Sequence, residues 1–546
     1  MNFQPFVQAG PRPWNGLRDD WLVRSFLGQR LPAEVRSAIE PELGDLAALA
    51  AGPLWDFQRA DRLNEPRLTR FDAWGNRIDH IEPSPLWREA ERLAVQFGLT
   101  AHPRERRHGA WSRVHQFLLV HLFHPVTDVY SCPLAMTDGA ARTLLASGNQ
   151  ALIGRAVPHL SSRDAGSFWT SGQWMTEATG GSDVGLSLTR AEHRDGTWRL
   201  YGKKWFTSAA TSQMALTLAR PDGNGPGGSG LALFYLETRD AAGQLNGIRV
   251  ERLKDKLGTR KVPTAELTLD GAVAHLVAGQ THGTRSIEPM LRVTRTWNSV
   301  CAASFLRHGL GLAGDYATRR VAFGARLADQ PLHRATLDDV DAESAGAFLL
   351  AFALVELLGR DEGGELDAGE AALLRLLTPL AKATTGRQAA AVASELVEAF
   401  GGAGYVEDTG IPVLLRDAQV LPIWEGTTNV LALDLLLRAD LDQGLAALRQ
   451  RIERACGTTT DRELRSAGAA GLAAADRAID WHRATRDPAE RQRVARRFTL
   501  TLGRAFQLAL LAEHAAAVAG GADGPAARQA CLRFRQLGVD QLPRQE

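Results

Sequence analysis

The sequence predicts an α+β protein, mostly α, in which a compact antiparallel β-domain lies between two helical blocks. Three observations support this prediction. Apolar residues recur at helical spacing before Met175. Alternation with a period of two residues replaces that spacing from Met175 to about Gly283, and long Ala/Leu-rich segments follow. With 546 residues, 45% of them apolar, the chain can form several domains with buried cores.

The first block, residues 1–174, is expected to be a helical domain with irregular connections. Residues 87–97 and 111–123 carry apolar side chains at the spacing of an amphipathic helix, and Pro, Trp and Gly separate such segments. The stretch FDAWGNRIDH, residues 71–80, is instead typical of a turn or a short hairpin.

The second block, residues 175–285, is expected to be the β-domain. Strand-like alternation appears in residues 196–206, 231–237 and 265–270, with Gly, Asp and Pro between the segments. This pattern favours short antiparallel strands joined by turns.

Helical patterns return after the β-domain. Residues 286–440 hold Ala/Leu-rich stretches whose lengths suit a four-helix bundle. A linker is expected at residues 439–445, and residues 441–546 form a further, Arg-rich helical domain. The clearest bundle stretches are residues 291–323, 342–359 and 370–400.

The composition argues against several classes of protein. A net charge of +1 gives the whole molecule no signature of a nucleic-acid or membrane partner. The four cysteines are scattered without metal-ligand spacing, so we expect reduced thiols and no metal site. The N-terminus lacks a signal-peptide pattern, and the most apolar helical stretch, residues 347–358, contains Glu356 and is too short to cross a bilayer. We therefore expect a cytoplasmic protein without membrane association.

One familiar motif is set aside. Gly309, Gly311 and Gly314 satisfy the dinucleotide fingerprint GxGxxG. That fingerprint requires a strand before it and a helix after it, whereas these glycines lie inside a continuous helical pattern. Small residues for close helix packing are the better interpretation, and no Rossmann domain is expected.

Three other segments have residue types suited to a ligand. Residues 175–184 (MTEATGGSDV) place hydroxyl groups beside glycines that let a backbone approach a ligand closely. Residues 204–208 (KWFTS) place aromatic side chains next to hydroxyls on a strand. Residues 416–430 (RDAQVLPIWEGTTNV) hold Glu425. Taken singly, the first two are as well explained by an ordinary turn and by core packing.

Glu425 follows apolar residues and precedes a glycine, so its carboxylate is expected at the boundary of an element. A carboxylate with little water around it can act as a base near neutral pH. The alternative is an acid stabilised by the N-terminus of the helix that follows. The local sequence by itself favours that alternative.

In combination and in this order, the segments resemble those of the acyl-CoA dehydrogenase superfamily, from the N-terminal helices to Arg438. MTEATGGSDV resembles the family's flavin-binding MTE…GSD loop, and KKWFTS is similar to its K-W-I-T strand. RVAFG with a later Gln, FGGAGY, and RDAQVLPIWEGTTNV resemble the family's R-x-x-F-G…Q, F-G-G-x-G-Y and RD…I-Y-E-G-T. Five motifs in one order form a specific signal.

The resemblance implies an FAD cofactor and assigns roles to residues. Glu425 falls on the family's catalytic glutamate, and Arg295 matches an Arg near the substrate entrance, although a helix-surface Arg is equally expected there. Arg320 and Gln330 are expected to reach the FAD pyrophosphate across a subunit interface. Glu398 stands where a Gln is usual, and its carboxylate would be a poor neighbour for the pyrophosphate. The implied FAD-binding residues are Met175, Thr176, Gly181, Ser182, Trp205, Phe206, Thr207, Arg320, Gln330, Gly401, Gly402, Thr427 and Asn429.

The reaction implied is the oxidation of an acyl-CoA. In the family reaction a carboxylate removes the α-proton of an acyl thioester while a hydride leaves the β-carbon for flavin N5. Glu425 is the implied base, so the expected activity is that of a flavin oxidoreductase.

Within the superfamily, the chain resembles the AidB-like adaptive-response branch. Residues 64–87 and 131–140 (SCPLAMTDGA), the IWEG form of the glutamate motif and the chain length carry this likeness. It implies a homotetramer, a connection with alkylation stress, weak acyl-CoA turnover and a C-terminal domain that binds double-stranded DNA.

The C-terminal residues supply a second hypothesis. From Leu441 onward there are 17 Arg and no Lys against 12 Asp and Glu, an excess of five positive charges. The densest cluster is Arg491, Arg493, Arg496 and Arg497, three of which share one helical face. Such a face could contact DNA phosphates. Nearby acids favour a solvated, salt-bridged face as the alternative. The hypotheses are thus an acyl-CoA oxidoreductase and a DNA-associated flavoprotein that protects against alkylation.

Overall fold

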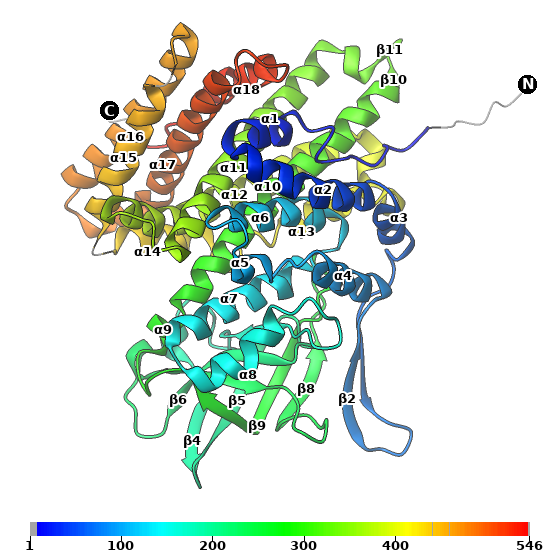
Figure 1. The fold of residues 1–546 in the computed structure, drawn as a ribbon, viewed down its shortest axis with the longest axis vertical. Coiled ribbons are helices and arrows are strands. Elements are labelled where there is room, and N and C mark those ends of the chain that lie inside the picture. The colour runs from blue at the N-terminus through cyan, green and yellow to red at the C-terminus, as the bar shows by residue number, and fades with distance from the viewer. Residues whose placement is uncertain (1–7, 439, 458, 544–546) are drawn as a thin grey trace, which may run out of the picture. The chain divides into compact units, whose positions relative to one another are not determined.

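The computed structural model describes residues 8–438, 440–457 and 459–543. They form two compact units. The β unit contains Ala60–Arg107 and Thr127–Trp297, and the helical unit contains the chain up to Arg59, His108–Val126 and the chain from Asn298 onward. Helices predominate in the chain, and all strands except the short β10 and β11 belong to the β unit (Figure 1). The predicted first block therefore contributes residues to both units.

The β unit is built on a seven-stranded sheet. The path runs β3-β6-β4-β5-β9-β7, β8 pairs with β9, and a β6–β7 pairing closes the path on itself. Most pairs are antiparallel, as predicted, but β6 runs parallel to β3 and to β4. Parallel neighbours need a long connection, which the intervening strands supply between β3 and β6. The strands are β3 (Ser171–Trp174), β4 (Arg190–Arg194), β5 (Thr197–Thr207), β6 (Met214–Pro221), β7 (Ala232–Glu237), β8 (Ile248–Leu253) and β9 (Ala265–Leu276).

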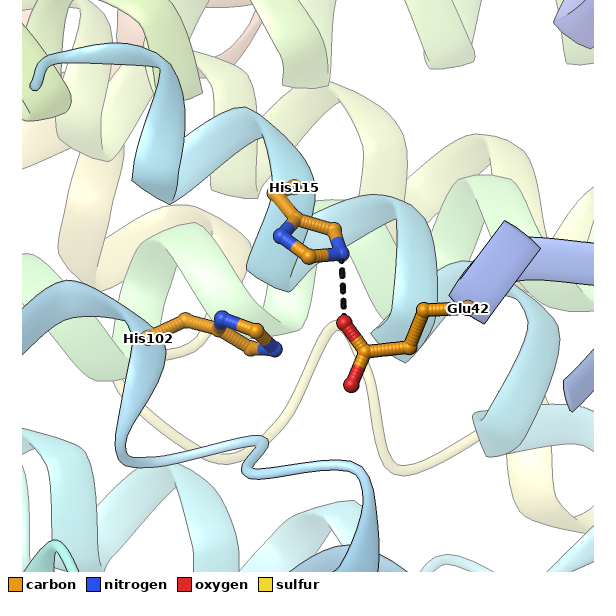
Figure 2. Close-up of side chains that lie close together, drawn as sticks. All are labelled: Glu42, His102 and His115. Atoms are coloured by element: carbon orange, nitrogen blue, oxygen red, sulfur yellow. Dashed lines mark ion pairs between the residues drawn. The ribbon is translucent and has the colours of Figure 1, made fainter. Parts of the chain in front are cut away.

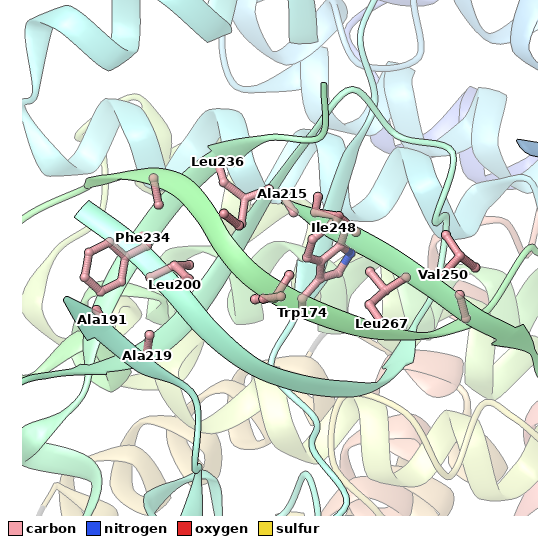
Figure 3. Packing of buried hydrophobic residues seen from close by; sticks show 14 of the residues in the cluster. Trp174, Ala191, Leu200, Ala215, Ala219, Phe234, Leu236, Ile248, Val250 and Leu267 are labelled. Atoms are coloured by element: carbon pink, nitrogen blue, oxygen red, sulfur yellow. The ribbon is translucent and has the colours of Figure 1, made fainter. Parts of the chain in front are cut away.

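Apolar side chains from these strands form one shared core (Figure 3). Trp174, Leu200, Phe234 and Leu267 come from four different strands and are all buried. Successive residues of a strand point to opposite faces, so each strand contributes alternate residues to this core. The alternation of apolar and polar residues in the sequence therefore predicts which side chains of each strand are buried.

A hairpin and several helices complete the β unit. β1 (Arg67–Phe71) pairs with β2 (Arg77–Glu82), which confirms the predicted hairpin. The helix predicted for residues 87–97 is α4 (Pro85–Gln96), which the Ser84 side chain caps at its N-terminus. The remaining helices are α5 (His102–Glu105), α7 (Ser131–Ser147), α8 (Gln150–Leu160) and α9 (Gly283–Ser286), and α7 packs on α8 and β3.

The helical unit begins with short helices and continues with long ones. α2 (Ala33–Ala50) packs on α6 (Trp111–Phe123), which matches the second predicted helix. Glu42 on α2 forms an ion pair with His115 on α6, whose Nε2 lies 3.0 Å from the carboxylate (Figure 2). The other helices before residue 439 are α1 (Trp21–Arg30), α3 (Pro53–Ala60), most of α10 (Glu288–Arg319), α11 (Pro331–Glu362), α12 (Ala368–Ala399), α13 (Ile411–Ala418) and α14 (Thr428–Leu436).

The three glycines of the GxGxxG pattern lie inside α10, which confirms that they form no dinucleotide loop. A Cβ on Gly309 would lie 2.6 Å from the Leu396 side chain, and one on Gly311 would lie 1.5 Å from the Trp14 ring. Close packing of this helix explains both glycines.

The helix predicted over residues 291–323 is wrong at its C-terminal end. α10 ends earlier, and β10 (Val321–Ala322) pairs with β11 (Ala325–Arg326). Phe323 and Gly324 form the turn with φ of +51° and +80°. Two successive residues in the left-handed region cannot continue a helix, so the apolar residues here belong to a hairpin instead.

α11 has the length and apolar character that a membrane-spanning helix requires. However, 78% of its most apolar stretch is buried inside the protein. The apolar stretch noted at residues 347–358 is thus the centre of a longer helix, and packing in a core explains its composition.

Within the described residues, four helices form the C-terminal part of the helical unit: α15 (Leu441–Cys456), α16 (Arg462–Ala484), α17 (Pro488–Ala517) and α18 (Gly524–Gln536). α17 lies beside α15 and α16 (Figure 1) and also packs on α12 and α14. A Cβ on Gly503 of α17 would lie 2.1 Å from the Thr384 hydroxyl of α12. Gln507 and Gln388 exchange two amide hydrogen bonds of 2.7 and 3.2 Å beside this contact. The C-terminal helices therefore pack directly on the bundle.

Candidate functional site

The loop that follows β3 is fastened to β5 by a buried ion pair. Lys204 on β5 is 0% exposed, and its Nζ lies 2.8 Å from Glu177 Oε1 and 2.9 Å from Leu218 O. The Glu177 carboxylate also accepts hydrogen bonds of 2.6 Å from the backbone N–H of Leu188 and from the Thr189 hydroxyl. One carboxylate therefore holds both ends of the loop.

The ion pair also sets the ionisation of Glu177. Burial alone would raise the pKa of Glu177, but the Lys204 ammonium and the hydrogen bonds bring this pKa below its ordinary value. A strand position that faces a core normally holds an apolar residue, so a lysine there requires a buried acid. The Glu177 carboxylate is thus ionised at neutral pH and fixes the position of the loop, while burial lowers the pKa of its partner Lys204.

The middle of this loop presents backbone and hydroxyl groups to solvent. Gly180 has a φ of +119°, a conformation that side chains rarely adopt, and Gly181 and Ser182 are exposed. A Cβ on Gly181 would lie 2.5 Å from Thr176 Oγ1. The backbone N–H of Trp205 donates to the Thr176 carbonyl at 2.9 Å. The predicted ligand groups of the loop are thus connected to the strand that carries Trp205.

Trp205 and Phe206 give the β unit an aromatic surface. Trp205 is half-buried, and Phe206 is 49% exposed. The Lys254 Nζ lies 3.5 Å from the Trp205 ring centroid and 4.6 Å from that of Phe206, at cation–π distance from both. The same ammonium lies 2.6 Å from Glu266 Oε1. A charged neighbour therefore restrains both rings.

The other two predicted residues of the β unit are buried. Met175 belongs to the core, and Thr207 is fully buried. The Thr207 hydroxyl donates to the Ala265 carbonyl at 2.6 Å. Because its hydrogen is used within the sheet, Thr207 can offer a ligand only oxygen lone pairs and backbone groups.

Glu425 lies in a strained turn before α14. Its φ is +58°, and Gly426 follows with a φ of +101°. A left-handed conformation costs a residue with a side chain about 1–3 kcal/mol. Thr427 caps α14, and Glu425 precedes that cap, outside the helical turn where an acid stabilises a helix most. A strained backbone at a half-buried carboxylate favours a functional role over a helix-stabilising one.

Two cations contact the segment that carries Glu425. Lys382 on α12 donates its Nζ to the Gly426 carbonyl. Arg496 on α17 places its Nη1 3.4 Å from Asn429 Oδ1. A residue predicted to contact DNA therefore lies against a residue predicted to contact FAD.

Gly401 and Gly402 form an open turn after α12. Gly401 has a φ of +58°, and a Cβ at either position would meet nothing within 4 Å. Glu398 is exposed in the last turn of α12. The turn therefore has space for a ligand, with the unusual carboxylate just before it.

Arg320 and Gln330 lie at the two ends of the β10–β11 hairpin. The Gln330 Nε2 donates to the Ala322 carbonyl at 3.1 Å, and the Arg320 Nη1 lies 3.5 Å from Gln8 Oε1. Phe323, at the tip, is 100% exposed. The hairpin thus brings the two predicted residues together beneath an apolar tip.

The predicted residues divide between the two units. Those of the segment 175–207 belong to the β unit, as does Arg295, which is half-buried on α10. Glu425 and the predicted residues from Arg320 onward belong to the helical unit.

The four arginines predicted to contact DNA have different surroundings. Arg491 donates to two backbone carbonyls, and Arg493 forms an ion pair of 2.7 Å with Glu490. Arg496 and Arg497 are exposed, and neither forms an ion pair with a carboxylate among the residues that the structure describes. Arg491, Arg493 and, through Asn429, Arg496 are therefore engaged within the chain, while no hydrogen bond or ion pair of Arg497 is found among the described residues.

Several side chains around these segments were not assigned from the sequence. Lys204 could have been identified, because it is a lysine at an inward-facing position of an alternating strand. Glu177, its partner, is the acid of the MTE motif. Lys254 and Arg496 contact residues that are remote in the sequence. No local pattern predicts such contacts.

The donor groups of the β unit suit a flavin dinucleotide. The exposed backbone near Gly181 and the Ser182 hydroxyl can donate hydrogen bonds to phosphate oxygens, and the Trp205 ring can pack on a flat heterocycle. In addition, Ser187 Oγ at the end of the loop is buried without a hydrogen-bond partner among the described atoms. A buried polar atom of this kind is expected where a ligand completes a site.

Known protein families match most of the chain. The adaptive response protein AidB N-terminal domain matches residues 21–165, the acyl-CoA dehydrogenase middle domain matches residues 172–272, and the acyl-CoA dehydrogenase C-terminal domain matches residues 281–439. The borders agree with the predicted order of helical, β and helical parts.

Individual proteins extend the similarity beyond residue 439. Acyl-CoA dehydrogenase family member 11 of Caenorhabditis elegans is 40% identical over 534 residues, which cover 93% of this chain and 86% of that protein. The putative acyl-CoA dehydrogenase AidB of Escherichia coli is 34% identical over 417 residues and 73% of each chain.

A solved structure shows the same fold. ACDH-11 of Caenorhabditis elegans, crystallised in complex with C11-CoA, superposes with a TM-score of 0.94 at 38% identity and covers 100% of this chain and 94% of its own. Members of the acyl-CoA dehydrogenase family are FAD-dependent, which confirms the predicted cofactor. The chain therefore belongs to the acyl-CoA dehydrogenase family, within its AidB-like branch.

Proposed function

We propose that this protein is an FAD-dependent oxidoreductase that introduces a double bond between the α- and β-carbons of an acyl-CoA thioester, with Glu425 as the base. The observation that carries the proposal is the backbone of Glu425. A half-buried carboxylate held at a φ of +58° is positioned at an energetic cost, which is typical of catalytic side chains.

The reaction divides the work between the chain and its cofactor. FAD, when bound, accepts the hydride that leaves the β-carbon. Glu425 removes the α-proton, which is acidic because the neighbouring thioester carbonyl stabilises the negative charge that develops. Lys382 donates a hydrogen bond to the Gly426 carbonyl and so restrains the backbone next to the base. The β unit supplies the aromatic surface at Trp205 and the donors of its loop.

The proposed substrates are acyl-CoA thioesters of medium chain length. The support is the C11-CoA that ACDH-11 of Caenorhabditis elegans holds in its crystal structure, at 38% identity to this chain. Arg295, on the β unit, is proposed to lie near the substrate entrance.

Anaerobic addition of acyl-CoAs of graded length tests the proposal, because reduction bleaches the flavin absorbance. We expect bleaching by medium chains and a rate at least about 100-fold lower in Glu425→Gln, the range by which a general base accelerates a reaction. Glu395→Gln makes the same chemical change at an exposed acid on α12 and is expected to leave the rate within a factor of two or so. Absence of bleaching by every chain length would exclude the reaction.

We also propose that the protein assembles as a homotetramer, with the β10–β11 hairpin in an interface. The support is the apolar tip of the hairpin, in which Phe323 is 100% exposed and Val321 is also exposed. A contiguous apolar tip of this kind is typical of an interaction surface. Sedimentation velocity of Phe323→Ser is expected to show smaller assemblies than the unaltered protein, and an unchanged tetramer would argue against this interface.

A second candidate function is that of a DNA-associated flavoprotein that protects against alkylation with little acyl-CoA turnover. The observation that favours it is the exposure of Arg496 and Arg497 on α17 without carboxylate partners among the described residues. Phosphate contacts of two arginines would give weak binding without sequence preference.

A further inference from the structure

A cavity opens within the helical unit, where the C-terminal helices pack on the bundle. It has a volume of about 180 Å³ and is lined by residues of α1, α11, α12, α15 and α17. None of these residues is assigned to the base, the flavin, the substrate or the DNA face. The match to the acyl-CoA dehydrogenase C-terminal domain ends at residue 439, before α15 begins. The cavity therefore depends on helices that lie outside that domain.

The inner wall of the cavity is apolar. The side chains that form it are buried and come from four helices. They are Phe26, Leu349, Leu373, Phe506 and Leu510. An apolar cavity of about 150 Å³ accommodates benzene, so the space here suits an apolar group of roughly six to eight carbon atoms.

His514 adds a polar group to the inner wall without adding a charge. It is 5% exposed, and its Nε2 lies 2.8 Å from the Ser25 hydroxyl. Burial lowers the pKa of His514 to about 4, so the imidazole is uncharged at neutral pH. The apolar part of a ligand therefore meets no charged imidazole at this position.

The carboxylates of the cavity are paired with arginines. Three glutamates belong to the lining, and each forms an ion pair with one lining arginine, where both side chains are half-buried. The pairs are Arg30 with Glu356 (3.0 Å), Arg360 with Glu370 (2.8 Å) and Arg451 with Glu513 (2.6 Å). An arginine beside a carboxylate offsets its charge, so these acids repel an incoming anion only weakly.

Arg454 is the fourth arginine of the lining, and its exposure places it at the mouth of the cavity. Among the residues that the structure describes, no carboxylate forms an ion pair with Arg454. Arg454 lies three residues after Arg451 on α15, so both side chains are on the same face of that helix. With four guanidinium groups, three carboxylates and a neutral imidazole, the lining carries one excess positive charge.

We propose that this cavity binds a medium-chain carboxylate, with the carbon chain against the apolar wall and the carboxylate on Arg454 at the mouth. A guanidinium group can donate two parallel hydrogen bonds to a carboxylate. One negative charge matches the single excess positive charge of the lining, whereas a phosphate dianion carries one charge too many. A ligand held between the bundle and the C-terminal helices stabilises the folded chain and raises its Tm.

Calorimetric titration of the FAD-loaded protein with butanoate, hexanoate, octanoate and dodecanoate tests the size of the site. Each buried methylene group lowers the Kd about fourfold, so affinity is expected to rise from butanoate to octanoate. It is not expected to rise further with dodecanoate, whose chain exceeds the cavity. Absence of binding by all four acids would overturn the proposal.

Two further compounds test the charge of the ligand. 1-Octanol has the same chain as octanoate but no charge, and it is expected to bind at least about tenfold more weakly. Octyl phosphate is also expected to bind more weakly, because of its second negative charge. Tighter binding of octyl phosphate than of octanoate would overturn the choice of a carboxylate.

Arg454→Gln removes the cation at the mouth and is expected to raise the Kd for octanoate at least about tenfold. Arg465→Gln is the matched control, because it makes the same change at an exposed arginine of α16 that does not line the cavity. It is expected to leave this Kd within about twofold. Neither variant is expected to change the Tm of the octanoate-free protein, since both arginines are exposed.

Ala353→Leu tests the cavity independently of charge. Ala353 is half-buried on α11 and lines the cavity, so the larger side chain occupies space that the ligand needs. Octanoate is then expected to bind at least about tenfold more weakly and to raise the Tm no longer, while the Tm without octanoate is unchanged or higher. If Ala353→Leu and Arg454→Gln both leave the Kd for octanoate unchanged, the cavity is not the site.

The flavin spectrum separates this cavity from the proposed catalytic site. Octanoate bound in the cavity is expected to leave the flavin absorbance unchanged, because no residue of the lining is assigned to the flavin. A spectral change that persists in Arg454→Gln would assign octanoate to the catalytic site and overturn the proposal. Failure of the proposed reaction is a separate outcome, because acyl-CoA would then not bleach the flavin while the octanoate titrations still report on Arg454.

Discussion

The two segments assigned to the flavin differ in how their charged side chains are partnered. In the β unit, Lys204 and Glu177 are opposite charges, fully buried, and the carboxylate is saturated with hydrogen bonds. In the helical unit, Arg496 lies 3.4 Å from the Asn429 side-chain oxygen and forms no ion pair with a carboxylate among the described residues. A buried ion pair fixes a loop before any ligand binds. A cation without a carboxylate partner can still attract an anion.

The comparison also shows where stability is concentrated. Breaking the buried pair leaves one charge in a core without water, so the whole β unit depends on it. Removing an exposed arginine leaves no unpaired charge in an apolar environment, so its effect on stability is small. Four predictions test this difference, in order of decreasing effect.

Acid is expected to have the largest effect, and to act on the helical unit first. Burial lowers the pKa of three histidines of that unit, to about 4 for His121, about 3 for His124 and about 4 for His308. Below their unfolded pKa of 6.5, the unfolded chain binds protons that the folded chain does not, so stability falls as the pH falls from 6.5 towards 4. At pH 5 the three histidines together lower the free energy of unfolding by roughly 6 kcal/mol.

The buried pair of the β unit responds in a lower pH window. The pKa of Glu177 is below its ordinary value of 4.5, so its contribution is complete above that pH and is lost only as the pH falls below it. Hydrogen exchange at pH 5 is therefore expected to rise in peptides around His121 and His308 before it rises in β5. His124→Leu should flatten the pH dependence, while His80→Asn, at an exposed position, should not. Equal acid sensitivity in both units would contradict this order.

Lys204→Met is expected to be the next most damaging change, because it leaves Glu177 charged and unpaired in the core. The expected loss is about 3–5 kcal/mol in the free energy of unfolding, together with loss of bound FAD. Lys203→Met, at the exposed neighbour, is expected to change stability by less than about 0.5 kcal/mol. Denaturant unfolding measures both.

A double variant sharpens the same test. Lys204→Met combined with Glu177→Leu removes both charges and is expected to recover much of the stability. FAD retention should remain low in the double variant, since Leu cannot accept the hydrogen bonds of Leu188 and Thr189 that position the loop. A single and a double variant with equal stability would show that the cost is not electrostatic.

Gly180→Ala is expected to have a smaller effect. The φ of +119° at Gly180 is strained for any side chain, and the expected cost is about 1–3 kcal/mol. Because the residue lies at the exposed part of the loop, FAD release should change more than the Tm. Gly225→Ala is the control, as a glycine in an exposed loop whose Cβ would also meet nothing within 4 Å. Equal FAD release from both variants would argue against a role of the loop in binding.

The smallest effect is expected at the DNA candidate face. Arg493 forms an exposed i,i+3 pair with Glu490, so Arg493→Ala should change the free energy of unfolding by less than about 0.5 kcal/mol. With Arg496 and Arg497 as the available cations, any DNA retention should weaken with a log–log salt slope of about −2. Mobility shifts at rising salt measure this slope. A much steeper slope would require a larger DNA surface than this face of α17.

Much of the fold follows from local patterns. Helical spacing at residues 111–123 gave a helix with those bounds, and alternation at residues 265–270 lies within β9. The prediction failed at residues 320–323, where apolar residues continue the helical pattern but the backbone turns at Phe323 and Gly324. The spacing of apolar residues predicts which face of an element is buried. It does not predict a left-handed backbone conformation at an apolar residue such as Phe323, and the turn depends on that conformation.

The candidate site was predicted unevenly for a similar reason. Glu425 and the MTE and KKW segments are contiguous motifs, so the sequence identifies them. The partners of those segments are remote: Lys204 meets Glu177 across the loop, and Lys382 approaches Gly426 from another helix. Such contacts exist only after the chain has packed.

The sequence by itself determined the family, the order of helical and β parts, the flavin cofactor and the identity of the proposed base. The tertiary structure decided which charged side chains have a partner of opposite charge and which do not. The 17 Arg counted from Leu441 onward appear alike in the sequence, yet Arg451 is paired with Glu513 while Arg496 lies against the neutral side chain of Asn429. Charge is a property of a residue, but its neutralisation depends on distance and burial, and these are set by the packing of helices that are far apart in the chain.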